Sequence, residues 1–336
     1  MNRPDGIWQA VGKQGKRKQA EKDVAGLLKQ IDLFEDLSDR DLRHIAQIAY
    51  RRSYRSGEPI VIEGQDAAGI MTYDERMHKE KGVGLAKEIF NSKNMELLTG
   101  NIGISHNRYP THGGFSHGEV QPFWTSVPYG IALAHNGNLT NYNDLASEVT
   151  KTETRYLNTT SDSEVLLHLF ADALHKDVPP QTSDDFFDLL CDSVNNIFNK
   201  VKGAYSVTSI IIGKGLVVFR DPNGIRPLVK GERSNGNGDR DYIFASENTM
   251  FYALVYEPKG TVLPGELIYV DESGKMFSKR LVKKEFNPCI FEYVYFARPD
   301  ARLNDVSVYR SRLRMGQNLA CLLYTSPSPR DATLSG

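Results

Sequence analysis

The middle of this chain arranges its strand-like and helical segments in blocks, and this order constrains the fold most. Two helical segments, 161–175 and 183–201, lie next to each other. The first has Ser161 or Ser163 at its start and the second has Ser183, and both carry acidic residues in the first turn. Blocks of strands, then helices, then strands indicate an α+β fold with layered sheets rather than alternating βαβ units. The strand-like segments, rich in β-branched residues, are 100–110, 129–139, 204–213, 215–221, 242–246 and a hairpin-like run at 266–282.

Composition and charge narrow the class of protein. Hydrophobic residues make up 40% of the 336 residues and the formal net charge is −1, so we expect neither nucleic acid nor a membrane as a partner. The basic leader, residues 1–23, lacks the apolar stretch of a secretory signal, and we expect a cytoplasmic protein. The cysteines Cys191, Cys289 and Cys321 are far apart, which indicates neither a disulfide framework nor a metal site.

Residues 1–63 differ in character from the rest of the chain. Their strings LFEDLSDRDLRHIA (33–46) and YRSGEPIVIEGQ (54–65) resemble the opening helix and first strand of a cyclic-nucleotide-binding domain. The phosphate-binding cassette of such a domain, a short helix that holds the cyclic phosphate, has no counterpart downstream. We interpret residues 1–63 as a foreign segment joined near Glu63–Gln65, which makes the chain a chimera. The alternative is a regulatory sensor of cyclic nucleotides.

Several strings in the middle of the chain occur in the order and spacing of one enzyme family. The first five resemble class II glutamine amidotransferases, which use an N-terminal nucleophile: GQDAAGI (64–70), HNRYPTHG (106–113), QPF (121–123), LAHNGNLTN (133–141) and TTSDSEVLLHLF (159–170). The strings RDPNGIRPL (220–228), FASE (244–247) and the stretch 288–320 are similar to the amidophosphoribosyltransferase branch. The resemblance implies a four-layer αββα sandwich.

This resemblance divides the rest of the chain into three parts. Residues 64–287 are identified as a type 2 glutamine amidotransferase domain, and 288–320 as the start of a phosphoribosyltransferase domain. Residues 321–336 are rich in Ser, Pro and Thr without an apolar period, so we predict a disordered, non-native tail. The family's first strand is missing here, and the strand-like run EPIVIEG (58–64) is the candidate to substitute for it.

The resemblance also implies a glutamine pocket. Arg108 matches the arginine that grips the glutamine carboxylate through two parallel hydrogen bonds. Asn136 and Gly137 match the oxyanion hole, in which a side-chain amide and a backbone N–H face the developing charge. The same Asn-Gly pair is also a common hairpin turn. Asp162 matches the acid that pairs with the α-ammonium, and the alternative is a first-turn helix acid next to the cap Ser161. Thr111 either shapes the pocket or is structural.

The family's nucleophile has no match in this chain. The family uses a cysteine at the mature N-terminus, whose α-amino group, with a pKa of about 7.7–8.0, serves as the base for its own thiol. Position 2 is Asn2, and every cysteine comes after Arg108, so trimming before residues 64–70 exposes no cysteine. We therefore predict that the chain does not hydrolyse glutamine. His135, next to Asn136, is expected to be a hydrogen-bonded structural histidine.

The implied activity of the family is glutamine hydrolysis that supplies ammonia to phosphoribosyl pyrophosphate. The product, 5-phosphoribosylamine, opens purine biosynthesis. We expect glutamine as the partner of this chain, with phosphoribosyl pyrophosphate and Mg²⁺ used by the phosphoribosyltransferase domain of a whole, homo-oligomeric family enzyme. No cofactor or metal site is expected in the chain itself, and the resemblance leaves an iron–sulfur cluster open. The alternative to catalysis is a glutamine-binding pseudoenzyme.

Overall fold

The structure of the protein is a computed structural model. The backbone divides into two units, residues 1–63 and 64–336. Only residues 38–40 of the first unit are described, so the strand and most of the helix that carry the cyclic-nucleotide resemblance lie outside the described residues. The described ranges are 38–40, 67–108, 117–151, 155–176, 178–236 and 238–325.

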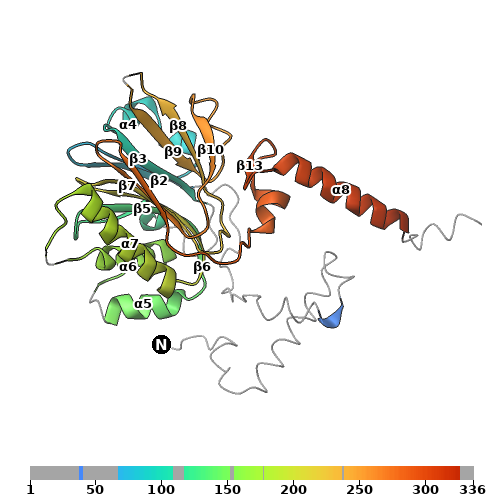
Figure 1. Cartoon of the computed structure of the whole chain (residues 1–336), viewed down its shortest axis with the longest axis horizontal. Coiled ribbons are helices and arrows are strands. Elements are labelled where there is room, and N and C mark those ends of the chain that lie inside the picture. Colours follow the sequence, from blue (N-terminus) through green and yellow to red (C-terminus); the bar gives the residue numbers. More distant parts are fainter. Residues whose placement is uncertain are drawn as a thin grey trace, which may run out of the picture. The chain divides into compact units, whose positions relative to one another are not determined.

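A six-stranded antiparallel sheet forms the centre of the second unit (Figure 1). Its spatial order is β12-β11-β7-β6-β5-β4. The hairpin predicted at 266–282 is confirmed, because β11 and β12 pair with Leu267 opposite Lys279. The strands are β4 (Phe123–Thr125), β5 (Ile131–Leu139), β6 (Gly203–Ile211), β7 (Gly215–Arg220), β11 (Glu266–Asp271) and β12 (Met276–Arg280).

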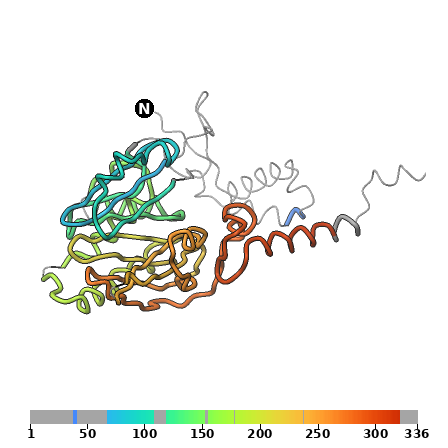
Figure 2. The backbone as a smooth tube through the Cα atoms, turned by 90° about the horizontal axis from the view of Figure 1, so that it is seen from above, coloured from blue at the N-terminus to red at the C-terminus, as the bar shows by residue number. Residues whose placement is uncertain are grey.

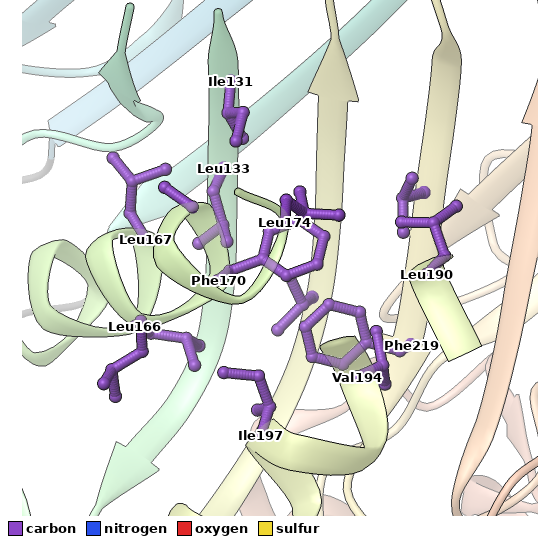
Figure 3. Packing of buried hydrophobic residues seen from close by; sticks show 14 of the residues in the cluster. Ile131, Leu133, Leu166, Leu167, Phe170, Leu174, Leu190, Val194, Ile197 and Phe219 are labelled. Atoms are coloured by element: carbon purple, nitrogen blue, oxygen red, sulfur yellow. The ribbon is translucent and has the colours of Figure 1, made fainter. Parts of the chain in front are cut away.

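Three helices cover one face of this sheet: α5 (Tyr142–Lys151), α6 (Asp162–Ala173) and α7 (Ser183–Lys200). The Ser161 side chain caps α6, as predicted. The cap of α7 is Thr182 rather than Ser183, because the Thr182 hydroxyl reaches the backbone N–H of Asp185. The apolar faces of α6 and α7 interlock with the sheet around Leu133, Phe170, Val194, Ile197 and Phe219 (Figure 3).

Two three-stranded sheets pack on the opposite face of the central sheet, and Figure 2 shows their strands apart from each other. The first has the order β2-β1-β3 and contributes Met71 and Ile104 to an apolar cluster with Ala132 and Ile210. The second has the order β10-β8-β9 and lies next to the apolar cluster that contains Val218 of the central sheet. The strands are β1 (Ala67–Tyr73), β2 (Met77–Val83), β3 (Ile102–Arg108), β8 (Val229–Ser234), β9 (Arg240–Ala245) and β10 (Glu257–Thr261).

Short helices α3 (Ala86–Ile89) and α4 (Ser92–Met95) form the outermost layer. Met71 points toward the central sheet, whereas Gly82 faces away from it. A Cβ placed on Gly82 would lie 3.3 Å from the Ile89 side chain, so α3 covers this outer face. The order helix, sheet, sheet, helix agrees with the predicted four-layer α+β sandwich (Figure 1).

The first small sheet bears on the predicted substitution of a missing strand. Its central strand is β1, and the outer edge of β3 pairs with no strand within the described ranges. Residues 58–64, the candidate substitute, lie outside those ranges. The substitution therefore stays a prediction.

The C-terminal part leaves the sandwich through η3 (Glu292–Phe296), a short pair of strands, β13 (Arg302–Leu303) and β14 (Val306–Ser307), and α8 (Val308–Thr325). The predicted tail began at residue 321, but α8 continues to Thr325. The reason is that the residues after Ala320 favour helix until the Ser-Pro pair that comes after Thr325. Among the described helices, none combines the length and apolar character that crossing a membrane requires.

Tyr205 offers a test of how burial and hydrogen bonding balance in the core. Its side chain is fully buried beside Phe198, and its hydroxyl has no hydrogen-bond partner among the described residues. Removing a buried unsatisfied hydroxyl avoids its desolvation cost, so we expect Tyr205→Phe to leave the free energy of unfolding unchanged or to raise it by about 1 kcal/mol. The measurement is urea-induced unfolding of both proteins.

The matched control for Tyr205→Phe is Tyr269→Phe. The Tyr269 hydroxyl donates a hydrogen bond to the Lys214 carbonyl at 2.7 Å. Its loss leaves a carbonyl without this donor, and we expect a decrease of about 1 kcal/mol. Equal decreases in the two variants would show that the Tyr205 hydroxyl is satisfied.

Candidate functional site

Asn136 and Gly137 lie within β5, not in a hairpin turn. They pair with Ser206 and Tyr205 of β6 in an unbroken antiparallel register, which excludes the turn interpretation of this Asn-Gly pair. Gly137 has a φ of 154°. A Cβ at this position would lie 1.9 Å from the Ala204 carbonyl oxygen and 2.8 Å from His135 Nε2. Only glycine therefore fits at this position, and its backbone approaches its neighbours closely.

His135 holds this end of β5 in place. Its backbone N–H donates to Gln121 Oε1 at 2.7 Å and its carbonyl accepts from Gln121 Nε2 at 3.0 Å. The ring is buried, with Nδ1 3.1 Å from Ser163 Oγ and 3.8 Å from Asp162 Oδ1. Desolvation lowers the pKa of His135, although the Asp162 charge opposes the shift. His135 is hydrogen-bonded and buried, as expected of a structural residue. Gln121, which follows η2 (His117–Glu119), makes both hydrogen bonds to its backbone.

Asp162, the first residue of α6, lies against the same strand. Its Oδ2 accepts a hydrogen bond from the backbone N–H of Leu139 at 3.0 Å, and its side chain is 12% exposed. The carboxylate also lies in the first helical turn, where the helix dipole favours negative charge. Both interpretations of Asp162 from the sequence are compatible with this position. The structure thus brings Asp162 together with the strand that carries Asn136 and Gly137.

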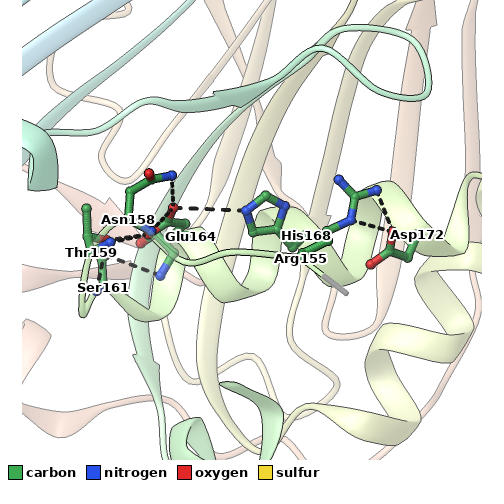
Figure 4. Close-up of polar contacts among 8 residues, drawn as sticks. Arg155, Asn158, Thr159, Ser161, Glu164, His168 and Asp172 are labelled. Carbon is green, nitrogen blue, oxygen red and sulfur yellow. Dashed lines mark hydrogen bonds and ion pairs between the residues drawn. The ribbon is translucent and has the colours of Figure 1, made fainter. Parts of the chain in front are cut away.

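A second buried carboxylate shapes the turn that leads into α6 (Figure 4). Glu164 Oε1 accepts from the Asn158 backbone N–H at 2.9 Å. Its Oε2 accepts from the backbone N–H and the hydroxyl of Thr159, at 2.8 and 2.6 Å. Thr160 continues the network by donating to Glu119 at 2.9 Å. These bonds fix the residues just before Asp162 and therefore the place of its carboxylate.

The hydrogen-bonded Glu164 carboxylate is expected to make the free energy of unfolding fall at acid pH. Burial raises the pKa of Glu164, but the hydrogen bonds from Thr159 and Asn158 outweigh it and hold the pKa below the ordinary value of 4.5. A depressed pKa contributes stability that is present above the unfolded-state pKa and lost as the pH falls through the folded-state pKa. We expect the difference in free energy of unfolding between wild type and Glu164→Gln to shrink from about pH 6 to pH 3.

Denaturant unfolding across this pH range measures that difference. The matched control is Glu96→Gln, a change at an exposed side chain after α4. Its difference from wild type should stay small at every pH. A difference for Glu164→Gln that stays constant with pH would contradict the assignment of the charged carboxylate to this network.

Of two further predicted site residues, the structure describes only the backbone of one, and the other lies outside the described residues. Arg108 is the last residue of β3, where it pairs with Ala67, and its side chain is not described. Thr111 lies within 109–116, outside the described residues. β3 packs over β5 and β6, which carries the backbone of Arg108 toward the layer that holds Asn136. The roles of Arg108 and Thr111 stay predictions.

The structure adds two residues that the sequence did not single out. Arg226 Nη2 donates to Asn136 Oδ1 at 2.9 Å, and Arg226 Nη1 lies 2.6 Å from Glu292 Oε1. Both residues belong to strings that pointed to one branch of the family, RDPNGIRPL and PCIFEY. Those strings were the available signal, but nothing in their local sequence connects them with Asn136.

The loop that presents Arg226 is built by its own preceding residues. The Asp221 carboxylate accepts the backbone N–H groups of Asn223 and Ile225 at 3.0 and 2.9 Å. Burial raises the pKa of Asp221, and these N–H groups and Arg220 oppose the shift. The fully buried Arg220 donates to the carbonyls of Arg226 at 2.6 Å and Gly224 at 2.7 Å. Two buried charges therefore hold the backbone of residues 221–226 in one shape.

Comparisons with known proteins identify the family of this domain. Residues 106–253 match the model of a glutamine amidotransferase domain. The amidophosphoribosyltransferase of Pseudomonas aeruginosa is 44% identical over 261 residues, which are 76% of this chain and 51% of that protein. The Escherichia coli and Saccharomyces cerevisiae enzymes of the same name are 45% and 41% identical over 76% and 80% of the chain, and over 51% and 53% of their own lengths. The chain carries a glutamine amidotransferase domain of the amidophosphoribosyltransferase family.

Solved structures support the same assignment of the amidotransferase domain. The glutamine phosphoribosylpyrophosphate amidotransferase from Bacillus subtilis, complexed with ADP and GMP, is 32% identical with a TM-score of 0.60, over 73% of this chain and 50% of that one. A structure described as the allosteric regulatory enzyme of purine biosynthesis is 32% identical with a TM-score of 0.65, over 79% and 53%. The α+β fold predicted from the block order of strands and helices is confirmed.

The comparisons also bound the assignment. The chain spans about half the length of the curated relatives it matches. None of these findings supports the cyclic-nucleotide-domain resemblance or the chimera proposed for residues 1–63, and both stay predictions.

Proposed function

We propose that this amidotransferase domain binds L-glutamine at the end of β5. The observation that carries the proposal is the bond from Leu139 N–H to the Asp162 carboxylate at 3.0 Å, since it joins an acid at the start of α6 to the strand of Asn136 and Gly137. In this pocket Asp162 pairs with the α-ammonium and Arg108 grips the α-carboxylate. Asn136 and Gly137 then face the side-chain carboxamide.

The reaction of the whole protein depends on the same pocket. A nucleophile adds to the carboxamide carbon, and the carbonyl oxygen takes up the negative charge that Asn136 and Gly137 stabilise. Collapse of this intermediate expels ammonia, and water later releases glutamate. In the whole protein the ammonia displaces pyrophosphate from C1 of phosphoribosyl pyrophosphate, which gives 5-phosphoribosylamine and releases pyrophosphate. Residues 288–320 begin the domain that uses this acceptor with Mg²⁺, in a cytoplasmic homo-oligomer.

We further propose that the chain of 336 residues binds glutamine without hydrolysing it. Cys191 belongs to the main core on α7, and burial raises the pKa of its thiol, which disfavours the reactive thiolate. Cys289 is partly buried beyond the sandwich strands. Within the described part of the chain, this arrangement favours a site that recognises glutamine without an attacking sulfur.

Calorimetry with L-glutamine and an ammonia-release assay on the same preparation test the proposal. We expect binding heat and no ammonia above the rate in buffer. A diazoketone analogue of glutamine, in combination with peptide mass spectrometry, searches for a covalent adduct. An adduct on the leading residue together with ammonia release would overturn the proposed inactivity, and an adduct on Cys289 would relocate the nucleophile. Absence of binding heat would overturn glutamine recognition itself.

A further inference from the structure

The contact between Arg226 and Asn136 determines which way the Asn136 carboxamide faces. A guanidinium has donors only, so the group that faces Arg226 Nη2 at 2.9 Å must be the amide oxygen. The NH₂ group of the same planar amide is then directed to the other side. Only this NH₂ group can donate to an oxyanion. An Asn136 side chain without Arg226 could turn over and present its oxygen, which would repel that charge.

Arg226 is itself held in one geometry. Its side chain is 20% exposed, and its guanidinium carbon lies 5.8 Å from the centre of the Phe296 ring. Its carbonyl accepts from the buried Arg220. The other terminal nitrogen of its guanidinium, Nη1, forms an ion pair with Glu292, whose side chain is 6% exposed. Water screens an ion pair in such a partly buried place less than it screens an exposed one.

Glu292 does not belong to the sandwich but to η3, at the start of the C-terminal segment 288–312. The rest of this segment is tied to η3 by partly buried polar contacts. Arg312, on α8, donates to the carbonyl of Tyr293 at 2.8 Å and to that of Ala297 at 2.7 Å. The Tyr293 hydroxyl accepts from Asn304 at 2.9 Å. A shift of α8 relative to the sandwich would therefore move η3 and change the distance between Glu292 and Arg226.

We propose that Arg226 is a positioning residue for the oxyanion-hole side chain of Asn136, and that Glu292 makes this positioning depend on the C-terminal segment 288–312. The inference rests on the proposed glutamine site. It gives the two parts of the chain a direct link, because the pair Arg226–Glu292 crosses from the sandwich to η3. Coupling of this kind is reciprocal: what orders the segment improves glutamine binding, and glutamine in turn orders the segment.

The first test measures binding of two ligands to wild type and to Arg226→Met. L-Glutamine has the carboxamide that Asn136 faces, whereas L-norvaline has a methyl group in its place. We expect the Kd for glutamine to rise about tenfold in the variant. The Kd for norvaline should change less than about twofold, because no carboxamide is recognised. Equal changes for the two ligands, or none for glutamine, would overturn the positioning role.

Matched variants guard this test against loss of folding. Arg233→Met removes an arginine that pairs with Asp241 at 2.8 Å on the exposed β8–β9 hairpin, and should leave both Kd values unchanged. Arg226→Lys keeps the charge but has one ammonium for two partners, so the glutamine-specific loss should recur. Near-ultraviolet circular dichroism reports the native packing of each variant. Full glutamine affinity in Arg226→Lys would contradict the requirement for a guanidinium that contacts both partners at once.

The second test reads the link from the C-terminal side by limited proteolysis of the full chain. We expect glutamine to slow cleavage within 288–312 in wild type, and Glu292→Gln to remove this protection. Arg226→Met should speed cleavage there even without ligand. If wild type binds no glutamine, the proposed function fails, and the ligand-free comparison still decides the Arg226–Glu292 link. Identical cleavage rates in wild type and both variants would overturn the link.

Discussion

Arg220→Met is expected to lower the free energy of unfolding by about 3–5 kcal/mol. The Arg220 side chain is fully buried and donates to three carbonyls, of Gly224, Arg226 and Val262, at 2.6 to 2.9 Å. It also donates to Asn304 Oδ1 at 3.2 Å from both terminal nitrogens. Burial lowers the pKa of Arg220 to about 10, so the guanidinium stays charged at neutral pH. Methionine fills much of the space but leaves these oxygens without donors.

Urea-induced unfolding of Arg220→Met and wild type measures this loss. Arg240→Met is the matched control, because Arg240 is 61% exposed and pairs only with Glu232 among the contacts described, at 2.9 Å. Its effect should stay within about 0.5 kcal/mol. Arg220→Lys should resemble Arg220→Met, since one ammonium cannot reach carbonyls on different loops as a planar fork does. A loss below about 1 kcal/mol in Arg220→Met would mean that the loop satisfies its own carbonyls.

The fold was accessible from the sequence wherever the apolar pattern of one segment determines its own structure. The helix that became α7 shows this, since its predicted span, 183–201, matches Ser183–Lys200 almost to the residue. The hairpin of β11 and β12 shows it too, because a short turn joins strands that are neighbours in the chain. In both cases local periodicity and turn chemistry agree with the tertiary structure.

The Asn136–Gly137 pair shows where local sequence is insufficient. Asn-Gly is a strong turn signal, yet here it lies in a strand. The deciding interaction is with β6, where the register from Ile131 opposite Ile211 to Leu139 opposite Gly203 pairs both residues. That pairing joins segments far apart in the chain. The neighbouring residues predicted both a strand over 129–139 and a turn at this pair, and only the long-range pairing decides between the two.

The site residues, too, could be predicted from the sequence only in part. Asn136, Gly137 and Asp162 were predicted from family strings, and the structure places them around one end of β5. Arg226 and Glu292 occur inside such strings, but the strings gave them no role. Arg226 is 90 positions from Asn136 in the chain, so only the folded loop after β7 brings them together. A residue such as Arg226, which acts by holding the side-chain amide of Asn136, produces no motif that the sequence alone would reveal.

Asp162→Asn is expected to raise the Kd for L-glutamine by about 30-fold or more. The substitution keeps the shape of the side chain, and its remaining carbonyl oxygen can still accept the Leu139 N–H that Oδ2 accepts now. What it removes is the negative charge of a group that is 12% exposed, where a ligand ammonium would be poorly screened by water. The loss should therefore fall on the ligand's ammonium group and not on the fold.

Two ligands separate recognition of the ammonium from a structural role of Asp162. Glutaramate is glutamine without the α-ammonium group, and its Kd should change less than about twofold in Asp162→Asn. Asp172→Asn, on the same helix and paired with Arg155 at 2.6 Å, is the matched control and should leave the Kd for glutamine unchanged. Calorimetry of both ligands with the three proteins gives the comparison. Similar weakening for glutamine and glutaramate would assign Asp162 to holding α6 against β5, because a residue that acts only through the fold does not distinguish ligands by their charge.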